Sequence, residues 1–110
     1  MPKIELRLPK VKDSKRLYEI LSNPNFIYFG VRQKSIEEEK EWIKGTPQKR
    51  KTNFEWNYVI IFQNKQVGAI GIKINQHRKY IGEIGYFIDE NYWGMGIASQ
   101  AVKLAEKKRI

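Results

Sequence analysis

Residues 82–99 read GEIGYFIDENYWGMGIAS, a stretch that predicts a strand, a short loop, a glycine pair and the start of a helix. Gly82–Ile88 is rich in β-branched and aromatic residues, which is typical of strands. Side chains alternate along a strand, so two sets should lie on opposite faces. These sets are Ile84, Tyr86 and Ile88 on one face, and Glu83, Gly85 and Phe87 on the other.

A helix is predicted directly after the glycine pair. Ile97, Ala101, Leu104 and Ala105 recur at helical spacing, and Ala98 and Val102 widen the apolar stripe. The basic run 107–109 follows this stripe, and cations suit the negative end of a helix dipole. The strand-to-helix unit is the part of the chain with the clearest pattern.

The joint between strand and helix contains Gly94, Gly96 and Ala98, which remove side-chain bulk where the helix begins. The first N–H groups of a helix have no acceptor within the helix, and they carry the positive end of its dipole. Phosphate groups commonly bind there. A Gly-x-Gly pattern taken alone is also explained by a tight turn with no ligand.

Taken together, residues 86–99 resemble the cofactor-binding segment of the GNAT superfamily of acetyl-CoA-dependent N-acetyltransferases. The family pattern is Arg or Gln, two variable residues, Gly, one variable residue, and then Gly or Ala. Here Trp93 stands at the first position, and Gly96 and Ala98 stand at the last two fixed ones. Tyr92-Trp93-Gly94 suits the branch that resembles ribosomal-protein N-terminal acetyltransferases. Trp93 removes one polar side chain but leaves the backbone N–H groups.

The resemblance implies acetyl-CoA as the co-substrate, no metal, and direct attack by an amine without a covalent enzyme intermediate. The backbones of Phe87 and Ile88 would pair with the pantetheine arm of the cofactor. The pyrophosphate would lie against the turn that follows, with the Ser99 hydroxyl as an added donor. The residues expected to bind the cofactor are Phe87, Ile88, Gly94, Met95, Gly96, Ile97, Ala98 and Ser99.

Glu83 is the candidate catalytic residue, because many family members carry a carboxylate at this place that takes the proton of the amine through water. Such a carboxylate must be buried to act as a base near neutral pH. The alternative is a strand carboxylate paired with Lys or Arg on the neighbouring strand. Two other features have simpler explanations: His77 lies in a predicted turn, and Glu37–Glu39 form a negative first turn of a helix.

The rest of the chain predicts further strands and helices. A strand over Lys3–Leu8 ends at Pro9, and a helix follows from Val11–Ser14 to Asn23-Pro24, with Asp13 or Ser14 as its N-cap. Ser35 and Glu38 form a capping box that starts a second helix, which runs to about Lys44 and is closed by Gly45-Thr46-Pro47. The remaining elements are strands Phe54–Gln63 and Gln66–Ile74, a hairpin turn at Asn64-Lys65, and a turn over Asn75–Lys79. Gly68 and Gly71 indicate weak points or a close approach of backbone.

The fold class is therefore α+β, with a mixed, mostly antiparallel sheet flanked by helices in the order β-α-α-β-β-β-α. This order matches the front part of the GNAT-like acyl-CoA N-acyltransferase fold. A length of 110 residues predicts one domain, and the resemblance implies that residues 1–110 are an N-acetyltransferase domain. GNAT domains continue with a strand, a helix and a final strand pair, so the resemblance implies a truncated domain that lacks its C-terminal part.

Composition narrows the function further. The chain has 110 residues, 41% of them hydrophobic, and no apolar run of membrane-spanning length, which favours a cytoplasmic protein. With no cysteine, a disulfide framework and a Cys nucleophile are excluded. A net charge of +9 favours anionic partners, although a solvated lysine-rich surface would explain it equally well. No nucleic-acid-binding motif is present.

The function expected from this reasoning is transfer of the acetyl group of acetyl-CoA to a primary amine, at a protein or peptide N-terminus. Two alternatives remain open: a non-catalytic fragment that binds CoA, and a small basic domain associated with the ribosome or RNA. The strand Gly82–Ile88 would be an uncovered sheet edge. A second copy of the chain, a separate chain carrying the missing half, or the pantetheine arm alone could cover it, and a homodimer is the commonest of these arrangements. The identity of the amine is not readable from the sequence.

Overall fold

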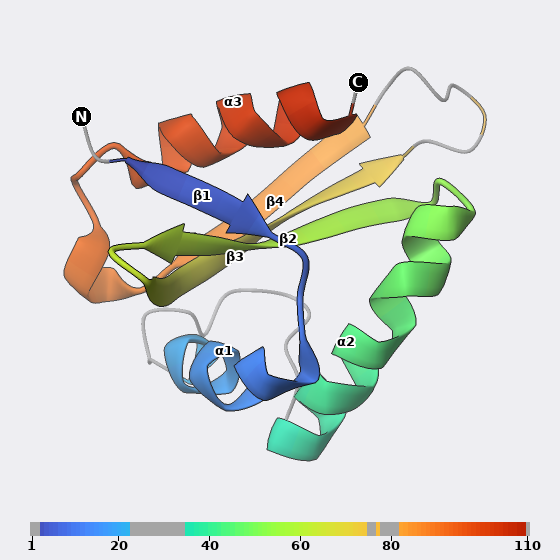
Figure 1. The fold of residues 1–110 in the computed structure, drawn as a ribbon, viewed down its shortest axis with the longest axis horizontal. Helices are drawn as coiled ribbons and strands as arrows, with labels where there is room; N and C mark the ends of the chain where they lie inside the picture. The colour runs from blue at the N-terminus through green and yellow to red at the C-terminus, as the bar shows by residue number, and fades with distance from the viewer. Residues whose placement is uncertain (1–2, 23–34, 75–76, 78–81, 110) are drawn as a thin grey trace.

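The computed structural model describes residues 3–22, 35–74, 77 and 82–109 (Figure 1). Four strands form one sheet with the spatial order β1-β2-β3-β4, and each neighbouring pair is antiparallel. The strands are β1 (Ile4–Arg7), β2 (Glu55–Phe62), β3 (Lys65–Ile74) and β4 (Gly82–Ile88). β4 is the last strand of this sheet, and it leads directly into the glycine-containing turn.

Helices cover both faces of the sheet. The helix α3 (Ile97–Arg109) lies across one face, and α1 (Ser14–Leu21) and α2 (Ile36–Lys51) lie on the other (Figure 1). Two short 3-10 helices, η1 (Val11–Asp13) and η3 (Glu90–Tyr92), precede α1 and follow β4. The predicted α+β class with helices flanking the sheet is thus confirmed. Within the described residues, none of the helices is long and apolar enough to cross a membrane.

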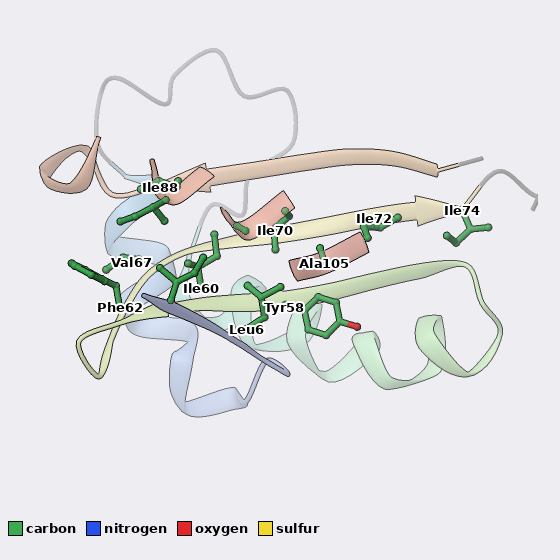
Figure 2. Packing of buried hydrophobic residues seen from close by; sticks show 13 residues of the cluster. Leu6, Tyr58, Ile60, Phe62, Val67, Ile70, Ile72, Ile74, Ile88 and Ala105 are labelled. Atoms are coloured by element: carbon green, nitrogen blue, oxygen red, sulfur yellow. The ribbon is translucent and has the colours of Figure 1, made fainter. Parts of the chain in front are cut away.

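The main hydrophobic core lies between the sheet and α3. Figure 2 shows Ile60, Ile70 and Ile88 pointing into this core from three neighbouring strands. From α3, Ile97, Ala101 and Ala105 pack against them, as the helical spacing predicts. A smaller cluster on the opposite face joins α1 and α2 to the sheet through Leu17, Ile43, Val59 and Ala69. Because β2 and β3 are buried on both faces, their sequences are almost continuously apolar.

The helix α2 is longer than predicted. Its start is confirmed, since the Glu38 backbone N–H donates to Ser35 Oγ across 3.2 Å. The predicted end at Gly45-Thr46-Pro47 is wrong, because the helix continues through Pro47 to Lys51. Proline has no N–H for the carbonyl four residues earlier, which here belongs to Ile43. The Thr46 hydroxyl donates to that carbonyl across 2.8 Å, so the buried acceptor keeps a partner and the helix can pass the proline.

The hairpin between β2 and β3 turns one residue earlier than predicted. Phe62 pairs with Lys65, so the two loop residues are Gln63 and Asn64 instead of Asn64 and Lys65. Both loop residues have positive φ, 51° and 63°, as a type I′ turn requires. This geometry matches the right-handed twist of the strands, and Asn64 is of a residue type that tolerates the left-handed region.

The expected close approach at Gly68 and Gly71 is confirmed. A Cβ atom on Gly68 would lie 2.1 Å from the backbone oxygen of Phe87, and one on Gly71 would lie 2.6 Å from Asn57 Oδ1. The register between β2 and β3 shifts beside Gly68, where Val67 is the extra residue of a β-bulge. The bulge turns Val67 toward the same core as Ile70.

The first helix begins as predicted, with Asp13 at the N-cap position of α1, although its side chain makes no capping hydrogen bond. The carboxylate instead accepts hydrogen bonds from Arg7, from Gln66 and from the Lys10 backbone N–H. The helix ends at Leu21, and the predicted stop at Asn23-Pro24 lies outside the described residues. The predicted turn over Asn75–Lys79 also lies outside them, apart from the exposed His77.

Candidate functional site

The turn between β4 and α3 is held in a defined shape. The Asp89 backbone N–H donates to the Val67 carbonyl across 2.7 Å, and Asp89 Oδ1 accepts from the Asn91 N–H across 3.0 Å. Gly94 and Gly96 then adopt φ of +80° and +79°, a region that side chains other than glycine rarely enter. The tight turn that a Gly-x-Gly pattern predicts is therefore present. A Cβ atom at either glycine would meet nothing within 4 Å, so both glycines also border open space.

The start of α3 leaves backbone donors at this open space. The first hydrogen bond of the helix runs from the Gln100 N–H to the Gly96 carbonyl, 3.3 Å apart. The N–H groups of Ile97, Ala98 and Ser99 precede it and have no acceptor within the helix. They lie at the positive end of the helix dipole. This geometry can hold a phosphate or pyrophosphate group.

A cavity of about 410 Å³ lies beside these donors. It is bounded by the end of β4, by the aromatic residues before the glycines and by the first turn of α3. The lining residues are Tyr86, Phe87, Ile88, Tyr92, Trp93, Gly94, Gly96, Ile97, Ala98 and Ser99. The structure thus brings together all of the residues expected to bind the cofactor except Met95, whose exposed side chain lies outside the lining.

Tyr86, Tyr92 and Trp93 also line the cavity, although sequence reasoning did not place them among the cofactor-binding residues. Tyr92 and Trp93 could have been found from the sequence, because they form an aromatic pair directly before Gly94. Trp93 is half exposed, and its indole Nε1 donates to the Ile88 carbonyl across 2.7 Å. That carbonyl is one of the groups expected to pair with a pantetheine arm. A carbonyl oxygen has two lone pairs, so one acceptor position is left for a ligand.

Arg16 fixes the junction at the end of β4 from the other side. Its guanidinium donates to Asp89 Oδ2 across 2.5 Å and to the Gln66 carbonyl across 3.0 Å. The neighbouring carboxylate of Asp13 is fully buried and paired with Arg7. Burial alone would raise the pKa of Asp13, but hydrogen bonds from Arg7, Gln66 and the Lys10 backbone outweigh that effect and hold the pKa below its usual value. These pairs join α1, β3 and the start of the glycine turn.

A second groove lies on the face of the sheet that carries α1 and α2. Its volume is about 340 Å³, and it shares Tyr86 and Phe87 with the cavity at α3. Charged or amide side chains line it from all three strands that form it. The lining residues are Trp42, Glu55, Asn57, Ala69, Ile70, Gly71, Lys73, Glu83, Ile84, Gly85, Tyr86 and Phe87.

Glu83 lies in this groove, on the face predicted for it. The side chain is exposed, so the burial on which a catalytic role depends is not present in the described part of the chain. Lys73 is its direct neighbour on β3, which is the position needed for the alternative interpretation, a strand carboxylate paired with a basic residue on the next strand. However, the Lys73 ammonium lies over the Phe54 ring, 5.8 Å from the ring centroid. On the other face of β4, Ile88 is buried, but Ile84 and Tyr86 are exposed.

Glu39 is a buried acidic residue that sequence reasoning did not distinguish from its neighbours. Glu37 and Glu38 are exposed, whereas Glu39 is only 2% exposed, and burial raises its pKa to about 7. Within the described residues, Glu39 Oε2 has no hydrogen-bond partner. Its position four residues before the buried Ile43 was the signal that it faces the core. It lines neither cavity.

The residues that the structure describes contain no group of three or more His, Cys, Asp or Glu side chains that could hold a metal ion.

Comparison with known proteins identifies the kind of domain. A family model described as an acetyltransferase (GNAT) domain matches residues 3–108. Among curated proteins, no sequence matches the chain. Among solved structures, the chain is similar to RimL, a ribosomal-protein alpha-N-acetyltransferase in complex with coenzyme A, with a TM-score of 0.81 and 23% identity. The similarity covers 96% of this chain and 62% of that one.

Two other solved structures show the same fold. An acetyltransferase from Salmonella typhimurium, which modifies the N-terminal serine of a 50S ribosomal subunit protein, has a TM-score of 0.79 and 24% identity, over 91% of this chain and 59% of that one. The microcin self-immunity acetyltransferase MccE, in complex with acetyl-CoA and AMP, has a TM-score of 0.78 and 20% identity, over 96% and 62% of the two chains. The chain thus spans about three fifths of the length of these structures, and the predicted GNAT-like fold is confirmed.

Proposed function

The chain belongs to the GNAT acetyltransferase domain family, and from this premise we propose that it binds acetyl-CoA and transfers the acetyl group to a primary amine at a protein or peptide N-terminus. The cofactor would lie in the cavity between the end of β4 and the start of α3. The amine would approach from the groove on the opposite face of the sheet. β4 borders both, through Tyr86 and Phe87.

The observation that carries this proposal is the glycine turn at the start of α3. Gly94 and Gly96 hold positive φ angles and border open space, and the N–H groups of residues 97–99 lie next to a cavity of about 410 Å³. If the turn served only to connect the strand to the helix, no cavity would be needed beside the N–H groups of residues 97–99. Pyrophosphate at this position would interact with the helix dipole. The net charge of +9 would also draw an anionic cofactor toward the protein.

The pantetheine arm would then run along β4 from the pyrophosphate. β4 is the outermost strand of the described sheet, so its outer edge can offer backbone groups to an extended ligand. Phe87 and Ile88 are the residues proposed to pair with the arm, and both line the cavity. This path brings the thioester toward the middle of β4, where the two cavities meet.

In the reaction, the neutral amine nitrogen would attack the thioester carbonyl carbon, and the resulting tetrahedral oxyanion would need hydrogen-bond donors. The C–N bond forms, the C–S bond breaks, and CoA leaves as a thiolate that takes up a proton. Glu83 is proposed to accept the proton of the amine through a water molecule. The exposed position of Glu83 in the groove leaves room for that water and for the incoming amine, and the bound substrates would have to bury the carboxylate before it could act as a base near neutral pH.

An N-terminal amine is the favoured substrate because of the proteins that share the fold. RimL is an alpha-N-acetyltransferase, and the Salmonella typhimurium protein modifies an N-terminal serine. The experiment that tests the proposal is mass spectrometry of peptides incubated with acetyl-CoA and the protein. A peptide with a free N-terminus should gain one acetyl group, and the same peptide with a blocked N-terminus should gain none. If the protein binds CoA but acetylates no peptide, the proposed transfer reaction is wrong and the chain is a non-catalytic CoA-binding domain.

A homodimer paired through β4 remains a proposal. Ile84 and Tyr86 are exposed on the α3 side of this strand, at 39% and 44%, next to its outer edge. Strand edges of this kind are commonly covered in natural proteins. Light scattering at several protein concentrations, with and without CoA, measures the association. A mass that stays at one chain under all of these conditions would contradict the dimer.

A further inference from the structure

A row of two glycines and one asparagine crosses the floor of the groove on the α1 and α2 face. Asn57 on β2 pairs with Gly71 on β3, and Gly71 pairs with Gly85 on β4. Residues paired in this way lie side by side and point to the same face of the sheet. Two of the three positions are glycine, so the row forms a trough whose only side chain is that of Asn57.

The neighbouring rows form the two banks of this trough. On one side, Glu55, Lys73 and Glu83 form a charged row. On the other side, Ala69 and Phe87 form an apolar bank, and their row continues to Val59, which is buried outside the groove. Trp42 of α2 also lines the groove. A ligand in the trough would therefore have its charged end next to Glu83 and an apolar side chain next to Phe87.

The glycines in the trough have different reasons for being there. A Cβ atom on Gly71 would lie 2.6 Å from Asn57 Oδ1, so Gly71 makes room for the Asn57 amide. A Cβ atom on Gly85 would meet nothing within 4 Å, so internal packing does not require a glycine there. The space over Gly85 is open to a ligand.

Asn57 supplies an independent sign of a ligand. It is 5% exposed, and its Nδ2 atom is buried with no hydrogen-bond partner among the described residues. A buried donor without an acceptor is costly, and nearly all buried polar groups in folded proteins find a partner. An apolar residue at this strand position would avoid the cost. Asn57 lines the groove, and a rotation of its side chain toward the trough would let a ligand there supply the missing acceptor.

We propose that Asn57 is a specificity residue that binds a backbone carbonyl of the peptide whose N-terminal amine is acetylated, with the peptide lying over Gly71 and Gly85. This inference rests on the proposed function. Asn57 and Glu83 lie on strands two apart, so their backbones are separated laterally by roughly 10 Å. The amine and a nearby carbonyl of an extended peptide, together with a water at Glu83, fit that span. A simple alkylamine has no carbonyl for Asn57 and would lose this contact.

The direct test is NMR spectroscopy of the ¹⁵N-labelled protein, with CoA present. The probes are a trialanine amide with a free N-terminus and propylamine. The peptide should shift the side-chain NH₂ resonances of Asn57 and bind in the millimolar range or tighter, whereas propylamine should leave these resonances in place. Peptide binding at saturation without any shift of the Asn57 NH₂ would overturn the proposal, as would no binding of the peptide at several millimolar.

Variants separate the contact from general effects on the fold. Asn57→Leu removes the amide at similar volume, and it should weaken peptide binding about tenfold while leaving the affinities for CoA and propylamine unchanged. Gln48→Leu, at an exposed position of α2, is the matched control and should change none of them. Equal peptide affinity in Asn57→Leu and the parent would contradict the inference. If Asn57→Leu does not fold, Asn57→Ser serves the same comparison.

Failure of the proposed function would look different. The titrations are repeated without CoA, and CoA binding is measured separately. A protein that does not bind CoA but still shows the Asn57 shift with peptide would refute the cofactor site and keep the peptide trough. A protein that binds CoA but shows no Asn57 shift with peptide would refute the peptide trough and keep the cofactor site.

Discussion

The indole Nε1 of Trp93 donates a hydrogen bond to the backbone oxygen of Ile88, 2.7 Å away. This bond closes the loop between the last residue of β4 and the residue before the first glycine of the turn. It therefore sets where the strand ends relative to the helix N-terminus that follows. GNAT proteins usually carry Arg or Gln at this position, and here a tryptophan fixes the local backbone instead.

Replacing Trp93 with Phe tests this role, because the ring is kept and only the N–H donor is lost. The free energy of unfolding should fall by about 1 kcal/mol, the usual net contribution of such a hydrogen bond. CoA affinity should fall a few-fold, since the turn would be less well ordered before binding. Calorimetry and thermal unfolding measure the two effects. Trp42→Phe, in the other groove, is the control, and an equal loss of CoA affinity in both variants would argue against the assignment.

Gly68 should tolerate no side chain. A Cβ atom there would collide with the Phe87 carbonyl at 2.1 Å, and backbone on the neighbouring strand cannot move aside without disturbing the pairing of β3 and β4. Gly68→Ala should lower the free energy of unfolding by about 3 kcal/mol or more. Gly85→Ala, on the next strand with open space around it, should change stability by less than about 1 kcal/mol. Denaturant unfolding of both variants checks this, and similar values for the two would be the contrary result.

Glu39 should make stability depend on pH. Burial raises its pKa from 4.5 to about 7 in the folded protein, so the folded state holds a proton that the unfolded chain releases above pH 4.5. The free energy of unfolding should therefore fall as the pH rises from about 4.5 to 7, by up to about 3 kcal/mol in total. The lowered pKa of Asp13 has the opposite sign, and it acts only as the pH falls below its ordinary value of 3.8.

Glu39→Gln should remove this pH dependence and unfold at a higher temperature than the parent above pH 7. Thermal unfolding from pH 4.5 to pH 8 measures the slope. Glu37→Gln, at an exposed position in the same turn, should keep the slope of the parent. A parent protein whose stability is flat or rising over this range would be incompatible with a buried, protonated Glu39.

Glu83→Gln tests the proposed proton acceptor. The substitution keeps the shape and removes the base, so kcat should fall by about 10²–10⁴-fold while CoA affinity stays the same. Glu55→Gln is the matched control, because Glu55 lines the same groove and is paired with Lys49 at 3.2 Å. The measurement is kcat for acetylation of a peptide by the parent and both variants. A fall in kcat of less than about threefold would indicate that Glu83 is a structural residue of the strand and not the proton acceptor.

The sequence was most informative where local chemistry decides the structure. β4, the glycine turn and the apolar stripe of α3 were predicted with the correct bounds, because strand alternation, positive-φ glycines and helical spacing are properties of neighbouring residues. The cavity residues followed from the same stretch. The places of Tyr86, Tyr92 and Trp93 in the lining, and the hydrogen bond made by Trp93, needed the folded chain.

Features that depend on particular side-chain contacts or on strand register were missed. The helix α2 passes Pro47 because the Thr46 hydroxyl replaces the missing donor, and the pattern of residues alone does not reveal that replacement. Asn57 lies in a strand that reads as apolar, and its place in the trough depends on pairing with Gly71 and Gly85 across two strands. Strand register of this kind is a tertiary property.

The central claim is that CoA binds at the glycine turn, and isothermal titration calorimetry on the parent and on Gly96→Glu tests it most directly. The glutamate would place a negative side chain in the open space where pyrophosphate is proposed to lie. Gly45→Glu is the control for added charge, because a Cβ atom at this helix position meets nothing within 4 Å. Thermal unfolding is the control for stability, because a side chain at the positive φ of Gly96 is strained. We predict micromolar binding to the parent and to Gly45→Glu, and binding at least tenfold weaker to folded Gly96→Glu. Equal affinity of CoA for all three proteins would contradict the account.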